Sequence, residues 1–276
     1  MAARTVSSLT EALARSPGLR VLDTRDEAAF ALGHPAGAGR LALSEFESRP
    51  MELPSRETPL LVVHDQPAMA ADAAAALVEM GFEHVVVLPV PLAGDPLGLV
   101  STAPAARLWS PSPFVERAVE CAPKGRALDL ACGSARAAVL LALGGWRAEG
   151  WDHDPSALER AREFAKRQGA DVTLRLVDLE AGALDDPPEP YHLIVVVRYL
   201  HRPLFPWIER SLARGGVLVY ETFRDGQQRF GPPRRERHLL RAGELLTGFP
   251  SLVIEHHEET PDGVPPLLAR LIARRP

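Results

Sequence analysis

The chain has 276 residues, of which 46% are hydrophobic and 24% are charged, a composition that excludes wholesale disorder and a minimal scaffold. The net charge is −5, and neither half of the chain has the basic excess expected of a nucleic-acid-binding surface. The longest apolar run, residues 137–146, is too short to span a bilayer, and the first residues lack an apolar secretory segment. The two cysteines, Cys121 and Cys132, have no metal-binding spacing, so we expect a cytoplasmic protein without disulfides or a metal site.

The first part of the chain predicts a small α/β unit. Short apolar strands are expected at residues 20–23, 60–63 and 84–88, and an alanine-rich helix at 68–80. Because strands alternate with helical segments here and further along the chain, the pattern favours parallel α/β sheets.

A stretch from Pro89 to Pro113 contains six prolines and shows no apolar period. Such a composition is typical of a connection between domains. We therefore predict a first domain over residues 1–90, a linker over 91–113 and a second domain over 114–276.

The second domain begins with a strand at residues 126–130, a loop of small residues at 131–135 and a helix at 136–143. This order is typical of a nucleotide-binding site, because the loop lets a ligand approach the backbone and the helix presents unpaired amides. The next two strands end at Asp152 and Asp178. A carboxylate at the end of the second strand can accept hydrogen bonds from both hydroxyls of a ribose.

Further strands are expected at 192–197, 215–220, 251–258 and 267–273, and a short helix at 242–246.

Two motifs in the first domain resemble the opening signature of rhodanese domains: Leu22-Asp23-Thr24-Arg25, and the residues from Gly33 to Ala38. The likeness covers about residues 5–90. In that family a cysteine that carries sulfur follows the strand equivalent to 60–63, with an arginine five residues later; here these positions are Asp65 and Ala70. A carboxylate cannot replace a thiolate nucleophile, so no sulfurtransferase activity is expected. Asp65 would cap the helix that follows or mimic a bound anion.

The loop of the second domain has an acid, Asp129, four residues before Gly133 and six before Ala135. Dinucleotide enzymes carry G-x-G-x-x-G instead, whereas this spacing resembles the D-x-x-x-G-x-G motif of class I S-adenosylmethionine (SAM) methyltransferases, with alanine in place of the last glycine. The resemblance spans about residues 113–275. Within that class, residues 199–203 and 220–223 are similar to small-molecule enzymes of the tellurite-resistance and thiopurine type.

The resemblance implies a fold class and a cofactor site. The protein would be an α/β protein with a small rhodanese-like domain and a seven-stranded Rossmann-like methyltransferase domain. The sheet of the second domain would be mostly parallel and would end in an antiparallel hairpin formed by the last two predicted strands. The cofactor would be SAM, with S-adenosylhomocysteine (SAH) as product. The residues expected to bind it are Asp129, Ala131 and Gly133 at the methionine part, Asp152 at the ribose, and Asp178 and Leu179 at the adenine. Cys132 would be a small buried filler, because methyl transfer needs no covalent intermediate.

The acceptor is expected at the ends of the fourth and fifth strands, where the carboxyl edge of a parallel sheet opens to ligands. The candidates are His201 and Tyr199 as catalytic residues and Arg198, Arg202, Tyr220, Glu221 and Arg234 as substrate-binding residues. His201 would serve as a base or as a neutral packed residue. The arginine-rich residues 224–241 would form a lid over an anionic substrate or a solvated loop.

The function predicted is methyl transfer from SAM to a small-molecule acceptor, with thiol or chalcogen acceptors ahead of oxygen or nitrogen. The alternatives are RNA or protein methylation with the first domain as a docking module, and a SAM- or anion-binding protein without catalysis. A small-molecule acceptor is the expected partner, no nucleic acid or membrane partner is expected, and a homodimer is left open.

Overall fold

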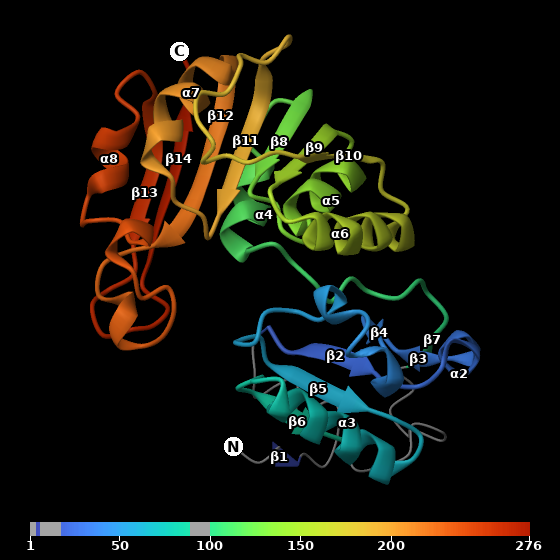
Figure 1. The fold of residues 1–276 in the computed structure, drawn as a ribbon. Coiled ribbons are helices and arrows are strands. Elements are labelled where there is room, and N and C mark those ends of the chain that lie inside the picture. The colour runs from blue at the N-terminus through green and yellow to red at the C-terminus, as the bar shows by residue number, and fades with distance from the viewer. Residues whose placement is uncertain (1–3, 6–17, 89–99) are drawn as a thin grey trace. The chain divides into compact units, whose positions relative to one another are not determined.

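The computed structural model describes residues 4–5, 18–88 and 100–276. Contacts between residues divide the chain into two compact units, Met1–Ser110 and Pro111–Pro276, which can be followed by colour in Figure 1. The boundary lies within the predicted linker, of which residues 91–99 lie outside the described part of the chain.

The first unit is built on a parallel sheet with strand order β1-β6-β5-β2-β4. Its strands are β1 (Arg4–Thr5), β2 (Arg20–Asp23), β4 (Gly39–Arg40), β5 (Leu60–Val63) and β6 (Val85–Val87), and its helical segments are α2 (Glu27–Leu32), η1 (Leu43–Glu45), η2 (Pro50–Glu52) and α3 (Pro67–Glu79). Every residue of β5 is fully buried, as expected of a parallel strand covered on both faces. The predicted α/β unit is confirmed.

The end of the first unit differs from the open linker that the prolines suggest. Strand β7 (Val100–Ser101) pairs with β3 (His34–Pro35), and the Ala106 amide donates to the Ala38 carbonyl over 2.9 Å. Leu108 is buried in the same apolar cluster as Leu22 and Leu60. A Cβ on Gly39 would overlap the Leu108 side chain. Residues 100–110 are therefore part of the packed first unit, because apolar side chains lie between the prolines.

The second unit contains the predicted seven-stranded sheet, in the order β10-β9-β8-β11-β12-β14-β13. The strands are β8 (Arg126–Leu130), β9 (Arg147–Asp152), β10 (Val172–Leu176), β11 (Tyr191–Val197), β12 (Leu212–Phe223), β13 (Val253–Glu259) and β14 (Leu268–Arg274). The first five are parallel, and β14 runs antiparallel to both β12 and β13. This confirms the predicted fold class.

Helices cover the two faces of this sheet (Figure 1). The helical segments are α4 (Pro113–Val119), α5 (Arg136–Leu143), α6 (Pro155–Gln168), η3 (Arg202–Leu204), α7 (Phe205–Ser211), η4 (Gln227–Arg229), η5 (Glu236–His238) and α8 (Glu244–Gly248). Leu193 and Val195 of β11 pack with α4 and α5, whereas Ile194 and Val196 pack with α7 and α8. Successive residues of a strand point to opposite faces, so this alternation places α4 and α5 on one face and α7 and α8 on the other.

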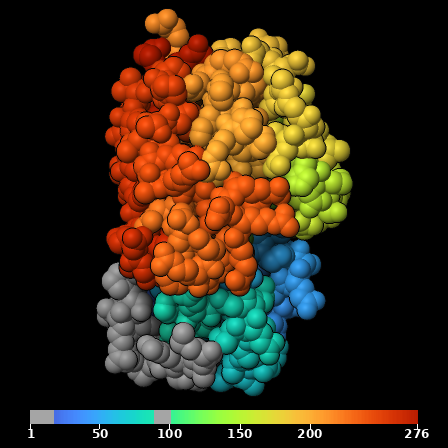
Figure 2. Space-filling model, turned by 60° about the vertical axis from the view of Figure 1, so that its left-hand side comes forward, coloured from blue at the N-terminus to red at the C-terminus, as the bar shows by residue number. Residues whose placement is uncertain are grey.

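Residues 224–252 connect β12 to the C-terminal hairpin through η4, η5 and α8. Figure 2 shows this stretch, in orange, at the surface of the second unit beside the red C-terminal residues. Within the described residues, no helix is both long and apolar enough to cross a membrane.

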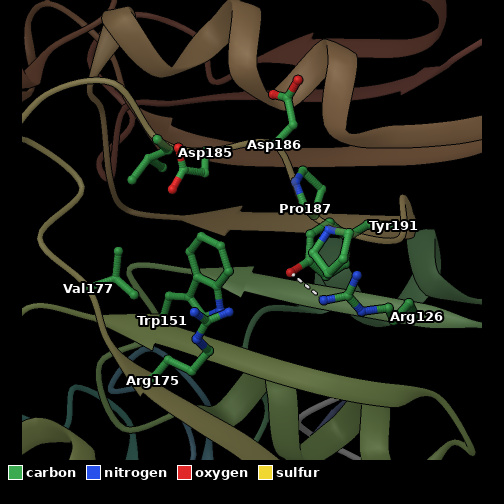
Figure 3. A pocket seen from close by; sticks show the side chains of 10 residues that line it. Arg126, Trp151, Arg175, Val177, Asp185, Asp186, Pro187 and Tyr191 are labelled. Carbon is green, nitrogen blue, oxygen red and sulfur yellow. Dashed lines mark hydrogen bonds between the residues drawn. The ribbon is translucent and has the colours of Figure 1, made fainter.

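The connection between β10 and β11 forms a loop over the α7 face of the sheet. Beneath residues 184–188 lies a cavity of about 240 Å³, which Figure 3 shows with Arg126, Arg175, Trp151 and Tyr191 around it. The carboxylate of Glu149 accepts hydrogen bonds from the side chains of Arg126, Tyr191 and Trp151. These polar groups beside the cavity are thus paired with one another.

Candidate functional site

The loop after β8 has an unusual backbone. Ala131, Gly133 and Ala135 all adopt left-handed conformations, with φ of 55°, 54° and 58°. For alanine this region costs about 1–2 kcal/mol, so the surrounding structure must hold the loop in place. A Cβ on Gly133 would meet nothing within 4 Å, which means that open space lies beside this backbone.

Asp152, at the end of β9, holds this loop against the neighbouring strand. Its carboxylate accepts from the amide of Gly133 over 2.8 Å and from the amide of Asp154 over 2.9 Å. Since a carboxylate has about four lone-pair positions, Asp152 can accept further hydrogen bonds. The carboxylate therefore lies next to the open backbone of Gly133, and its contact with a ribose stays a prediction.

Asp129 lies deeper than the methionine-binding position implied for it. Its side chain is only 3% exposed and accepts from the amide of Ala138, in α5, over 3.0 Å. Burial raises the pKa of Asp129 to about 7, and the nearby charge of Asp152 acts in the same direction. The residue thus joins β8 to α5 beneath the loop, and direct contact with a ligand stays a prediction.

This pKa leads to an expected pH dependence of stability. Between about pH 4 and 7 the folded protein binds a proton at Asp129 that the unfolded chain has lost, so the free energy of unfolding falls as the pH rises. From pH 5 to pH 7 the expected loss is about 2 kcal/mol. In Asp129→Asn this loss should disappear, because an asparagine side chain does not titrate, while its oxygen can still accept from the Ala138 amide. Urea unfolding at both pH values, followed by tryptophan fluorescence, measures it; parallel pH curves for both proteins would contradict this pKa.

The predicted adenine side of the site lies after β10. Asp178 accepts from the amide of Glu180 over 2.9 Å, and Leu179 is buried in the core. The hydroxyl of Tyr199 is buried and, within the described part of the chain, has no hydrogen-bond partner at normal distance, although the side chain of Glu180 lies near enough to act on it as an acceptor. Burial first, then the charges of Glu180, Asp178 and Asp152, raise the pKa of Tyr199. Its phenol thus lies on the cofactor side, whereas the sequence placed it among the catalytic candidates.

These features fit a nucleoside bound at the carboxyl edge of the sheet. The backbone of Gly133 is open, the carboxylate of Asp152 has remaining lone pairs, and Tyr199 offers a buried hydroxyl. A buried hydroxyl without a partner costs free energy. A ligand with ribose hydroxyls and ring nitrogens can supply the missing hydrogen bonds.

Two predicted acceptor residues have internal partners instead. Tyr220 is 1% exposed and donates to the Tyr199 carbonyl over 3.0 Å, among the rings of Phe205 and Phe249. Glu221 is 3% exposed and pairs with Arg270 at 2.6 Å. Both would have to give up these partners to bind a substrate. The structure therefore assigns Tyr220 to the core and Glu221 to a buried ion pair between β12 and β14.

Arg202 has a similar structural role. It pairs with Glu244 at the start of α8 and donates to the carbonyls of Arg237 and Leu239. These contacts attach residues 237–244 to the first residue of η3. Within the described residues, two further candidates have no such role: His201 is partly exposed and precedes η3, and Arg234 is exposed between η4 and η5. Their roles as base and substrate ligand stay predictions.

Arg198 is the predicted substrate residue whose side chain reaches solvent at the carboxyl edge. It follows β11 directly, is exposed and has a left-handed φ of 56°. Sequence reasoning missed its neighbour Arg136, the first residue of α5. Burial, and after it the charge of Arg198, lower the pKa of Arg136 to about 10. One feature of the sequence could have pointed to Arg136: it is the only charged residue between positions 131 and 146.

Cys132 packs inside the loop. A Cβ on Gly150 would lie 3.0 Å from its sulfur, so the thiol fills the space that this glycine leaves. Burial, followed by the charges of Asp129 and Asp152, raises the pKa of Cys132. A raised pKa disfavours the thiolate, in agreement with a filler rather than a nucleophile.

In the first unit, Asp65 has another partner than expected. It lies between β5 and α3, where Gln66 is the N-cap residue, and its carboxylate pairs with Arg25 at 3.2 Å. Arg25 also pairs with the buried Asp23 at 2.6 Å. Asp65 therefore does not cap α3. It forms an ion pair with Arg25, the last residue of the first rhodanese-like motif.

Comparison with known families agrees with the two motif sets. Residues 127–216 match a family model described as a methyltransferase domain, and residues 5–89 match the rhodanese-like domain. The chain therefore combines a methyltransferase domain with a rhodanese-like domain. The methyltransferase match agrees with SAM as the predicted cofactor.

Individual relatives share only part of the chain. Trans-aconitate 2-methyltransferase of Streptomyces coelicolor is 38% identical over 106 residues, covering 35% of this chain and 34% of the relative. Ribosomal protein L11 methyltransferase of Ectopseudomonas mendocina is 39% identical over 98 residues, covering 34% and 32%. The solved structure of TehB from Haemophilus influenzae has a TM-score of 0.49 and 19% identity, covering 59% of this chain and 61% of that one. The chain spans about a third of the length of the curated relatives it matches.

Proposed function

We propose that this protein transfers a methyl group from SAM to a small-molecule acceptor. The observation that carries the proposal is the carboxyl edge of the second sheet, where the carboxylate of Asp152 accepts from the open backbone of Gly133. The charge of Asp152 also contributes to the raised pKa of the buried Tyr199 hydroxyl. The methyltransferase-domain match over residues 127–216 supports the same chemistry.

When bound, SAM supplies an electrophilic methyl group on a sulfonium. The chain's own residues would hold the cofactor and align the acceptor beside Arg198. The acceptor's lone pair forms the new bond while the carbon–sulfur bond breaks and leaves its electron pair on sulfur. In such a displacement the protein contributes mainly proximity and orientation.

A thiol or chalcogen acceptor is slightly favoured. Within the described residues, His201 has no carboxylate within ion-pair distance, so a histidine–carboxylate base pair is not part of the site. A thiol ionises more readily than an alcohol and needs less help from a base. The first unit is proposed to transfer no sulfur, since residues 1–110 contain no cysteine.

Calorimetry with SAH and a turnover assay that measures SAH release test the proposal on the full chain. We expect SAH binding, and turnover with small molecules from a panel of thiols, hydroxyl compounds and amines. No binding of SAH would overturn the cofactor assignment. Binding without turnover on any acceptor would favour a SAM-binding protein without catalysis.

A protein acceptor is the second candidate, because one partial relative is named ribosomal protein L11 methyltransferase. The same assay with total cell protein and total RNA distinguishes the options. Turnover with either macromolecule but with no small molecule would replace the small-molecule proposal, with the rhodanese-like domain as a docking module.

A further inference from the structure

Arg198 is held in a strained backbone conformation at the mouth of the site. Its φ of 56° is costly for a residue with a side chain. Its amide donates to the carbonyl of Glu221 in the adjacent strand over 2.7 Å. Strained residues of this kind concentrate at functional sites, where the surrounding structure compels them. In this protein the left-handed conformation of Arg198 turns the chain directly after the last residue of β11.

Among the described residues, the guanidinium of Arg198 has no acidic partner. Its carbon lies 5.7 Å from the centre of the Phe223 ring. No carboxylate of the described residues lies within 4 Å of its nitrogen atoms. In contrast, Arg224 pairs with Asp262 and donates to the Thr260 carbonyl. The exposed Arg198 is therefore available to a ligand.

A second positive charge lies close to Arg198. Arg136 begins α5, directly after the loop that follows β8, and β8 and β11 are neighbouring strands paired through Leu130 and Val196. The repulsion between the two arginines contributes to the lowered pKa of Arg136. Two like charges near one helix N-terminus, itself positive, favour an anion between them.

The nearby acids Asp129 and Asp152 have backbone partners of their own. Asp129 and Asp152 accept hydrogen bonds from the backbone amides of Ala138, Gly133 and Asp154. Their carboxylates thus belong to the loop and the cofactor side.

We propose that the methyl acceptor is an organic anion with a carboxylate group, which Arg198 binds directly and Arg136 attracts. This inference rests on the proposed methyl transfer and adds the charge class of its acceptor. A guanidinium suits the task, because it binds a carboxylate through two parallel hydrogen bonds. The position beside the loop would orient the acceptor's nucleophilic atom towards the cofactor.

The test separates a metabolite extract on an anion-exchange column at pH 7 and assays every fraction for SAH formation with SAM and the full-length protein. We expect turnover in the retained, anionic fractions. With the active fraction, Arg198→Gln should raise the acceptor KM at least 10-fold and leave the KM for SAM within about twofold. Arg198→Lys should recover part of the loss, since it keeps the charge but not the paired hydrogen bonds.

The control is Arg214→Gln, an exposed arginine near the opposite end of β12, which should leave both constants unchanged. Equal SAH affinity of all variants, measured by calorimetry, shows that the site remains folded. If Arg198→Gln weakens SAH binding 10-fold or more, the arginine binds the cofactor and the inference is wrong.

The remaining outcomes separate the inference from the proposed function. Turnover only in the unretained fractions leaves methyl transfer intact and overturns the anionic acceptor. Unchanged acceptor KM in Arg198→Gln overturns the role of Arg198. No turnover in any fraction, although SAH binds, overturns methyl transfer to small molecules and the inference together.

Discussion

Replacing Asp152 by alanine is expected to weaken the binding of SAH about 100-fold. The change removes the carboxylate that would accept from the ribose and that now holds the Gly133 amide over 2.8 Å. Hydrogen bonds to a charged group contribute about 1.5–3 kcal/mol each, and each 1.4 kcal/mol is a factor of ten in affinity. Calorimetric titration of the full-length protein measures the effect.

Asp154→Ala is the matched control for Asp152→Ala. Asp154 lies two residues further on and caps α6 by accepting from the amide of Ser156 over 2.8 Å. Its loss should cost about 1 kcal/mol of stability and leave SAH affinity within about twofold. Equal affinity of Asp152→Ala and the parent would remove the ribose assignment.

The largest loss of stability is expected from Arg270→Leu. Arg270 pairs at 2.6 Å with Glu221, which is almost inaccessible to solvent, and at 2.8 Å with the more exposed Glu258. A buried carboxylate left without its partner costs about 3–5 kcal/mol. Urea unfolding monitored by tryptophan fluorescence reports mainly on the second unit, because Trp146, Trp151 and Trp207 lie there.

Arg274→Leu provides the comparison for this variant. Arg274 lies four residues further along β14 and pairs with the exposed Glu255, so its replacement should cost about 1 kcal/mol or less. In the double variant Glu221→Leu, Arg270→Leu, most of the stability should return, since no charge is left buried. Equal losses for the two single variants would show that burial of Glu221 does not govern the effect.

The strands of both units could be predicted from sequence, because their signal is local. The run Leu60–Val63 is apolar at every position, as a doubly covered parallel strand requires. Asp152 could be predicted for a related reason: a residue that ends a strand must lie at the sheet's carboxyl edge. The α/β organisation and the ribose candidate thus follow from short segments.

The roles of Tyr220 and Glu221 could not be predicted in this way. They are adjacent at the end of one strand, so their side chains point to opposite faces, and each meets an element distant in the chain. Tyr220 packs with Phe249, and Glu221 pairs with Arg270. Tertiary packing determines which helix covers Tyr220 and which arginine pairs with Glu221. A local sequence pattern does not contain this information.

Arg136 and Arg198, at the proposed acceptor site, likewise could not be brought together from local sequence patterns. Arg136 and Arg198 are 62 positions apart in the sequence. They come to the same edge of the sheet because they follow β8 and β11, which are paired strands. The arginine-rich residues 224–241 gave a stronger local signal. Yet Arg224 there is paired internally, which an excess of charge in the sequence does not reveal.

The packing of residues 100–110 determines where the chain can be divided for separate expression. A fragment beginning near residue 91 would carry Leu108 without the apolar cluster that buries it. It would also leave the β3 strand of the other fragment without β7. Exposed apolar side chains and unpaired strand edges promote aggregation. A methyltransferase fragment beginning at Pro111 avoids both defects, because Leu108 and β7 then stay with the cluster and the strand that they contact.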